Sequence, residues 1–246
     1  MNKNTNTYAV ILAGGEGSRM GYNIPKQFIE IYNKPIIIYT LEIFQKNQNI
    51  KGIVVVCIKA FLDYMTNLVK QYNLSKVISV IEGGDNFQKS VINSMNYLKK
   101  IATYDDNVLI HMSVAPFIDD EIIDDSISVC NKFGNGFSAN DMLLCMGLRE
   151  KDSLFSTKGI NRDELVGLNT PQTCKFFKLN GLYERAIKSK EIESIEPHIS
   201  SLLYYYGEKI YFSKGSSKNI KITTKDDLEL FKSYVYFKNN GGIKND

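Results

Sequence analysis

Hydrophobic residues form short continuous runs along the chain, separated by longer segments in which apolar residues recur every three or four positions. The continuous runs predict buried strands, and the helical spacing predicts amphipathic helices. Strands are predicted at 8–12, 52–58, 77–81 and 108–111, and helices at 36–46, 61–72, 87–100 and 119–133. Buried strands that alternate with helices are typical of a parallel sheet covered on both faces. We therefore expect an α/β fold with three α/β/α layers and a mostly parallel central sheet.

The C-terminal half of the chain is less regular. Residues 150–174 carry Gly159, Pro171 and many polar residues, and they predict an excursion from the sheet that projects as an arm. The remaining predicted elements are helices at 176–190 and 199–206, strands at 209–212 and 219–222, and a helix from Lys225. Neither a repeat nor a linker divides the sequence, so we expect one Rossmann-like domain over residues 1–246 with a dimerisation arm at about 150–174.

Composition limits the class of protein. Hydrophobic residues make up 43% of the 246 residues and charged residues 23%, which is an ordinary balance for a globular domain. The net charge of +3 is too small to indicate a nucleic-acid partner. No apolar stretch reaches the ~18 residues that a membrane span needs, and the polar N-terminus does not resemble a signal peptide. The scattered cysteines suggest free thiols, so we expect a cytoplasmic protein.

The first predicted strand ends in a loop rich in glycine. Residues 13–21 read AGGEGSRMG and are followed by IPKQF at 24–28. Small residues after a strand allow backbone N–H groups to surround phosphate oxygens. In a parallel sheet this loop lies at the carboxyl ends of the strands, where ligands bind.

Several interpretations of this loop compete. A Walker loop ends in Gly-Lys-Ser/Thr, which is absent here. A dinucleotide fingerprint fits Gly15 and Gly17, but Met20 stands where its third glycine should be. A triphosphate site uses Arg19 and Lys26 as cations that neutralise the phosphates. A tight turn with surface cations would need no ligand, but four glycines in eight residues argue against it.

The triphosphate interpretation agrees with a resemblance. Residues 12–21, together with Pro25-Lys26-Gln27-Phe28, resemble the sugar-nucleotide transferase superfamily. Within this superfamily, the Pro-Lys-Gln-Phe motif resembles that of the cytidylyltransferases that act on methylerythritol phosphate and ribitol phosphate. The resemblance implies that CTP binds at this loop and that Arg19 and Lys26 are catalytic. It also implies that the triphosphate is bound by Leu12, Ala13, Gly14, Gly15, Glu16 and Gly17.

Further motifs extend the resemblance over most of the chain. Gly83-Gly84-Asp85 and Ser90 resemble the segment that faces the cytosine base. Arg162 and Thr170-Pro171-Gln172 match the arm, which in the family reaches into the partner subunit of a dimer, and the resemblance makes Arg162 and Thr170 acceptor-binding residues. Lys221 in Asn219-Ile220-Lys221-Ile222-Thr223 matches the C-terminal signature and is implied to be the third catalytic residue.

Several positions depart from the family pattern. Met112 replaces an aspartate that helps to hold Mg²⁺, Ala115 replaces an arginine, Phe87 stands near the place of another arginine, and Lys218 stands where many relatives have an aspartate. We therefore expect that Mg²⁺, as a cofactor, binds through the substrate phosphates alone, or that a cationic side chain near the triphosphate partly replaces it. The acceptor-binding threonine and aspartate of the methylerythritol enzymes align near Glu196-Pro197-His198, which leaves His198 as a candidate acceptor contact.

The resemblance implies in-line attack by the acceptor phosphate on the α-phosphorus of CTP, with release of pyrophosphate. The altered acceptor side favours a ribitol-5-phosphate-like polyol, used to make precursors of a cell-surface polysaccharide such as a capsule. Three alternatives stay open at this point: a methylerythritol phosphate enzyme, a catalytically impaired nucleotide-binding homologue, and a dinucleotide oxidoreductase.

Overall fold

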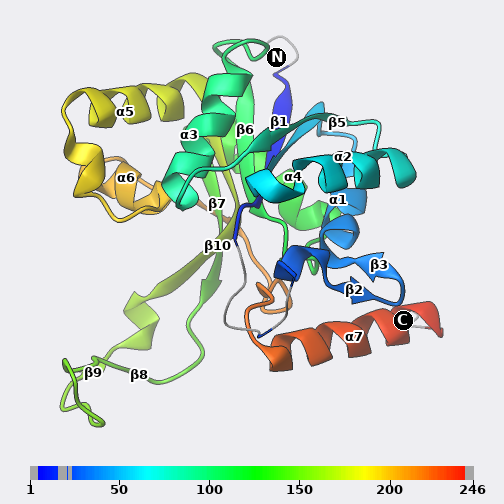
Figure 1. The fold of residues 1–246 in the computed structure, drawn as a ribbon. Coiled ribbons are helices and arrows are strands. Elements are labelled where there is room, and N and C mark those ends of the chain that lie inside the picture. The colour runs from blue at the N-terminus through cyan, green and yellow to red at the C-terminus, as the bar shows by residue number, and fades with distance from the viewer. Residues whose placement is uncertain (1–4, 16–20, 22–23, 242–246) are drawn as a thin grey trace.

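The computed structural model describes residues 5–15, 21 and 24–241 and is built on a central seven-stranded sheet (Figure 1). The strand order is β11-β7-β10-β6-β1-β4-β5. The strands are β1 Thr7–Ala13, β4 Gly52–Cys57, β5 Val77–Glu82, β6 Asn107–Met112, β7 Asn135–Asp141, β10 Val166–Lys175 and β11 Phe212–Lys214. β10 is antiparallel to both β6 and β7, and the other pairs are parallel. The expected mostly parallel sheet is confirmed.

Helices cover both faces of this sheet. One face carries α3 Phe87–Leu98, α5 Phe176–Lys188 and α6 Ile199–Tyr205. The opposite face carries α1 Ile36–Lys46, α2 Leu62–Gln71 and α4 Asp120–Phe133. The described residues also form the short 3-10 helices η2 Lys26–Phe28, η3 Lys59–Phe61, η4 Arg162–Glu164 and η5 Glu191–Glu193. The three-layer architecture follows because each amphipathic helix buries its apolar stripe on the sheet.

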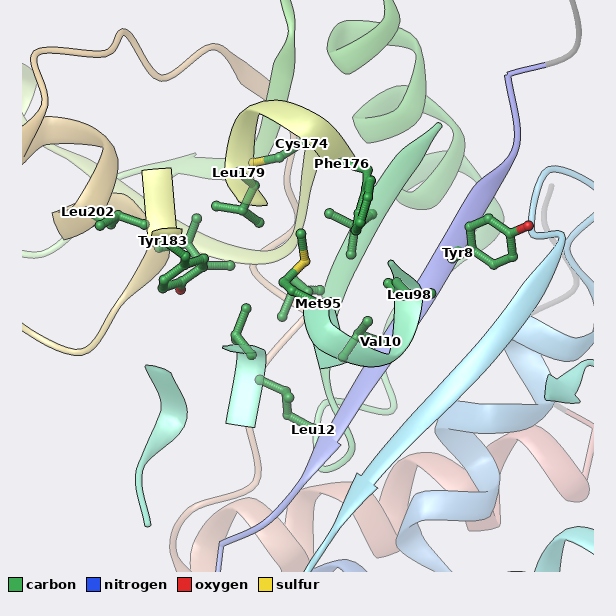
Figure 2. Packing of buried hydrophobic residues seen from close by; sticks show 14 of the residues in the cluster. Tyr8, Val10, Leu12, Met95, Leu98, Cys174, Phe176, Leu179, Tyr183 and Leu202 are labelled. Carbon is green, nitrogen blue, oxygen red and sulfur yellow. The ribbon is translucent and has the colours of Figure 1, made fainter. Parts of the chain in front are cut away.

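The alternation of side chains along β1 divides the core in two. Tyr8, Val10 and Leu12 belong to the cluster on the α3 and α5 face, whereas Ala9 and Ile11 belong to the cluster on the α1 and α4 face. Successive side chains of a strand point to opposite faces, so a strand that is apolar at every position is buried on both. Figure 2 shows the first of these clusters, with residues of β1, α3, α5 and α6 packed together.

The last helix, α7 Lys225–Asn239, closes the carboxyl end of the sheet (Figure 1). It packs on the small hairpin of β2 Glu30–Ile31 and β3 Lys34–Pro35 through a third apolar cluster. The Thr224 hydroxyl accepts a hydrogen bond from the Asp227 N–H, and the Asp227 carboxylate accepts one from the Thr224 N–H. This reciprocal pairing satisfies two of the N–H groups that a helix start leaves without a partner.

The structure corrects the predicted arm. The chain leaves the sheet after Asp141 and returns at Val166, with a hairpin of β8 Met146–Gly147 and β9 Gly159–Ile160 far from the sheet (Figure 1). The second part of the predicted excursion, residues 166–174, is the central strand β10. Proline is unusual inside a central strand, and Pro171 coincides here with a register irregularity of the ladder between Leu168 and Gln172.

Two further predictions of strands were wrong or incomplete. The predicted pair 209–212 and 219–222 does not form, because β11 covers Phe212–Lys214 and pairs with β7, and residues 219–222 are not a strand. β7 was not predicted, since its sequence NGFSAND is largely polar. Among the described residues, no helix is long and apolar enough to cross a membrane.

Candidate functional site

A cavity of about 660 Å³ lies at the carboxyl ends of β1, β4, β5 and β6. It joins two glycine-rich loops that are about seventy residues apart in the sequence. The predicted nucleotide-binding residues that line it are Leu12, Gly14, Gly15, Gly83, Gly84, Asp85 and Ser90. Met112, at the end of β6, and Phe87, at the start of α3, complete its wall. The sheet therefore brings most of the predicted nucleotide-binding residues together.

Ser90 holds the two loops in place. Its hydroxyl is buried and accepts a hydrogen bond from the main-chain N–H of Gly84 at 3.0 Å. A Cβ placed on Gly14 would lie 3.4 Å from the same Oγ, so the two loops meet at this side chain. The contact fixes the direction of the Gly84 peptide at the cavity wall.

Gly84 is required by close approach of the backbone. A Cβ at this position would lie 2.2 Å from Cβ of Lys89 and 2.8 Å from its carbonyl carbon, so any side chain would force the turn to move. The turn continues directly into α3, where the Asn86 side chain accepts a hydrogen bond from the Lys89 N–H at 2.8 Å. This cap explains why the helix begins at the cavity.

Two ion pairs lie at the described wall of the cavity. Asp85 forms an ion pair with Lys89 at 2.7 Å, and its hydrogen bond with Lys89 and the charge of that ammonium hold the pKa of Asp85 below its usual value. Glu82 lies 3.5 Å from Lys59. Both carboxylates in the described part of the cavity wall are therefore paired with lysines, one from η3 and one from α3.

The segment Pro25-Lys26-Gln27-Phe28 packs against the end of β1. Gln27 is buried and donates a hydrogen bond from Nε2 to the carbonyl of Ala13 at 2.7 Å. Ala13 does not line the cavity, because its side chain belongs to the core on the α1 face. The sequence analysis did not predict this contact of Gln27. The position of Gln27 inside the Pro-Lys-Gln-Phe motif could have marked it as a candidate, but its hydrogen-bond partner depends on the tertiary fold.

Lys26 is largely buried and points toward the C-terminal segment. Its Nζ donates a hydrogen bond to the carbonyl of Ile222 at 2.9 Å. Lys221, the neighbouring predicted catalytic residue, is exposed. Lys26 is thus bonded to the main chain of the residue that follows Lys221, and neither lysine is among the described residues that line the cavity. The third predicted catalytic residue, Arg19, lies outside the described residues, as do Glu16 and Gly17.

The three predicted acceptor-binding residues lie apart. Thr170 is buried in β10, where its carbonyl accepts a hydrogen bond from Asn219. Arg162 lies on the projecting arm, and its guanidinium donates to the carbonyl of Leu143. His198 occupies the N-cap position of α6, and its ring lies 5.5 Å from that of Phe87, which lines the cavity. A single chain does not bring Arg162 to Thr170.

The described residues of the cavity do not offer a set of protein ligands that suits magnesium. Mg²⁺ takes hard oxygen ligands, and Met112 offers a thioether at the end of β6. Glu82 and Asp85 are both paired with lysines. Within the part of the chain that the structure describes, no three His, Cys, Asp or Glu side chains gather as a metal cluster.

His111 is a structural residue beside this cavity. It is fully buried, and its Nε2–H donates to the carbonyl of Ala115 at 3.0 Å. Burial lowers its pKa to about 4, with the bond to Ala115 opposing the shift, so the ring is neutral at pH 7. The contact holds the loop after β6, which also carries Val114.

Comparison with protein-family profiles now gives the family. Residues 7–236 match the family of 2-C-methyl-D-erythritol 4-phosphate cytidylyltransferase. The chain belongs to this family. It is 38% identical over 228 residues to the ribitol-5-phosphate cytidylyltransferase of Lacticaseibacillus paracasei, covering 92% of this chain and 97% of that protein. It is 36% identical over 235 residues to the 2-C-methyl-D-erythritol 4-phosphate cytidylyltransferase of Clostridium novyi, covering 92% and 95%.

Solved structures agree with the fold. The 2-C-methyl-D-erythritol 4-phosphate cytidylyltransferase of Francisella tularensis superposes with a TM-score of 0.75 at 27% identity, covering 93% of this chain and 99% of that one. The 4-diphosphocytidyl-2C-methyl-D-erythritol synthase of Anaerococcus prevotii superposes with a TM-score of 0.78 at 22% identity, covering 95% and 100%, which supports the Rossmann-like fold alone. The expectation of a cytidylyltransferase is confirmed.

Proposed function

We propose that this cytidylyltransferase transfers CMP from CTP to a ribitol-5-phosphate-like polyol phosphate. An oxygen of the acceptor phosphate attacks the α-phosphorus of CTP, the bond from that phosphorus to the bridging oxygen breaks, and pyrophosphate leaves. The observation that carries the proposal is the single cavity in which the loop after β1 meets the Gly83–Gly84 turn. In this proposal the loop after β1 binds the phosphates of CTP, and the Gly83–Gly84 turn faces its cytosine base.

Charge stabilisation supplies most of the catalysis in this proposal, because both reactants are anions. Arg19 and the amides of the first loop hold the triphosphate. Lys26 and Lys221 stabilise the charge that develops on the α-phosphate. The buried setting of Lys26 strengthens its interaction with an anion, since the local dielectric is lower than that of water. Magnesium, when bound, neutralises phosphate charge, and its ligands here would be phosphate oxygens rather than protein carboxylates.

The arm supports a homodimer. Arg162 and Thr170 hold one acceptor phosphate only if the arm of a second copy supplies Arg162. The arm and its base expose several large apolar side chains to solvent, and an exposed apolar patch usually marks an interaction surface. These side chains are Leu143, Leu144, Leu148, Leu154, Phe155 and Val166. We therefore propose that the arm of each copy packs against a second copy of this chain in a homodimer.

The acceptor is assigned from the relatives and from the altered positions Met112, Ala115 and Lys218. Ribitol-5-phosphate cytidylyltransferases are among the similar proteins, at 34% to 38% identity. An activated ribitol would feed a capsule or wall polymer. The enzyme would work in the cytoplasm, where CTP is available and where the buried free thiols of Cys57, Cys130 and Cys174 stay reduced.

Pyrophosphate release tests the proposal directly. The purified protein is incubated with each of the four nucleoside triphosphates and with ribitol 5-phosphate, methylerythritol 4-phosphate or another pentitol phosphate. Each mixture is assayed with and without Mg²⁺. Release with CTP and ribitol 5-phosphate supports the assignment. Release only with methylerythritol 4-phosphate selects the other acceptor, and tight CTP binding without release selects an impaired homologue.

A pair of lysine variants excludes a contaminating activity. Lys221→Ala should abolish most of the release, whereas Lys225→Ala, an exposed lysine at the start of α7, should retain it. Equal activity of the two variants would refute the role assigned to Lys221.

A further inference from the structure

Asn219 joins the C-terminal segment to the strand that carries Thr170. Its side chain is 1% exposed and donates a hydrogen bond from Nδ2 to the carbonyl of Thr170 at 2.6 Å. Its own carbonyl accepts a hydrogen bond from Nδ2 of Asn169 at 2.7 Å. Two residues adjacent in β10 therefore hold the main chain and the side chain of one asparagine.

The same segment is anchored a second time, three residues later. The N–H of Ile222 donates to the carbonyl of Val114 at 2.8 Å, and the carbonyl of Ile222 accepts from Lys26 Nζ at 2.9 Å. Lys221 lies between the two anchors. Figure 1 shows this run, in orange, between β10 and α7. The backbone on both sides of Lys221 is thus fixed, at one end to the acceptor side and at the other to Lys26.

The junction at Asn219 is not arranged for stability alone. Asn169 accepts a hydrogen bond from the Thr170 N–H at 2.8 Å, which orients the Thr170 backbone. Yet Oγ1 of Thr170 and Oδ1 of Asn219 are buried without a hydrogen-bond partner among the described residues. Unsatisfied buried polar atoms destabilise a fold, and they are tolerated most often where function fixes the residues.

We propose that Asn219 is a positioning residue that sets Lys221 in register with Thr170, and hence with the acceptor phosphate. This inference rests on the proposed function, in which Thr170 binds the acceptor and Lys221 stabilises the reacting α-phosphate. Asn219 itself touches neither substrate in this proposal. Small displacements of catalytic groups cost large factors in rate, so loss of the anchor should act on the acceptor step and not on CTP binding.

The test compares Asn219→Ala with Asn135→Ala. Asn135 is a matched control because it is also 1% exposed and its side chain makes two long-range hydrogen bonds, to the carbonyl of Lys209 and from the N–H of Tyr211. Lys209 and Tyr211 precede β11 and do not belong to the segment at 219–222 that carries Lys221. Thermal unfolding should show a similar loss of stability in both variants.

Kinetics separate the two. Asn219→Ala should lower kcat/KM for the acceptor about tenfold or more, with the KM for CTP within about twofold of wild type, and Asn135→Ala should leave both values within about twofold. Equal effects of the two variants, or an unchanged acceptor kcat/KM in Asn219→Ala, would overturn the inference.

A milder variant covers the case in which Asn219→Ala does not fold. Asn169→Ala removes both the bond to the Asn219 carbonyl and the bond from the Thr170 N–H, and it should reduce acceptor kcat/KM about threefold without raising the KM for CTP. Absence of this split would also overturn the inference. A wild-type protein that releases no pyrophosphate with any acceptor refutes the proposed function instead, so the two failures are distinguishable.

Discussion

Nζ of Lys26 donates a hydrogen bond to the carbonyl of Ile222 at 2.9 Å, across 196 residues of sequence. The contact joins the Pro-Lys-Gln-Phe segment after the first glycine-rich loop to the Asn-Ile-Lys-Ile segment near the C-terminus. The side chain of Lys26 is 8% exposed, so its ammonium lies at the edge of the core and not in open solvent. A buried cation is costly unless polar partners hold it, and it interacts strongly with a bound anion.

Replacing Lys26 with methionine should therefore affect activity far more than stability. We expect kcat/KM to fall by about 10²–10³-fold through loss of charge stabilisation, and the free energy of unfolding to fall by about 1 kcal/mol through loss of one hydrogen bond. Lys34→Met is the control, because Lys34 lies on neighbouring β3 and pairs with Glu42 outside the candidate site. Comparable activity of the two variants would remove Lys26 from the catalytic group.

Ser90 and Ser94 offer a matched pair on α3. Both hydroxyls are buried, but Ser90 accepts a hydrogen bond from the N–H of Gly84 at the cavity, whereas Ser94 donates to the carbonyl of Val91 within its own helix. Ser90→Ala should raise the KM for CTP roughly fivefold, the equivalent of about 1 kcal/mol, because the Gly84 peptide loses its anchor. If Ser94→Ala raises that KM as much, the effect is general loss of packing.

Met112 provides a test of how magnesium is held. It stands at the cavity wall, where the two described carboxylates, Glu82 and Asp85, are paired with lysines. A carboxylate at position 112 would add an oxygen ligand that has no lysine partner of this kind. Met112→Asp should lower the Mg²⁺ concentration needed for half-maximal activity severalfold, measured by titration of pyrophosphate release. Met112→Asn has a similar size without the charge. Identical Mg²⁺ titrations of the two variants would show that the position does not contact the metal.

His111 predicts a loss of stability in acid. Its pKa is about 4 in the folded protein and about 6.5 when unfolded, so the unfolded chain binds more protons between these values. The stabilisation is complete above pH 6.5 and is lost as the pH falls toward 4, by up to about 3 kcal/mol. Urea unfolding at pH 7.5, 6.0 and 5.0 measures this slope.

The control for this prediction uses the second histidine. His111→Gln should remove the slope, while His198→Gln should keep it, because His198 is mostly exposed. A slope that survives in His111→Gln would assign the pH dependence to other groups.

The sequence predicted most of the sheet and its helices because buried parallel strands are apolar at every position. β4 follows this rule, β1 departs from it only at Thr7 and β6 only at Asn107 and His111, and each strand lies within one or two residues of its predicted bounds. β7 does not follow it. It contains buried polar residues, and one of them, Asn135, bonds through its side chain to the carbonyl of Lys209, a partner far away in the chain. Local periodicity contains no information about such partners.

The candidate site divides in the same way. The two glycine-rich loops, Lys26 and the C-terminal segment were recognisable as motifs, because backbone approach and charge demand particular residue types at fixed spacing. Only the tertiary structure decided that the loops share one cavity, that its carboxylates are paired with lysines, and that Arg162 lies far from Thr170 in one chain. It also revealed Asn219 as the link between β10 and Lys221. Strand order and long-range hydrogen bonds set these distances, and neither is written in the local pattern of the chain.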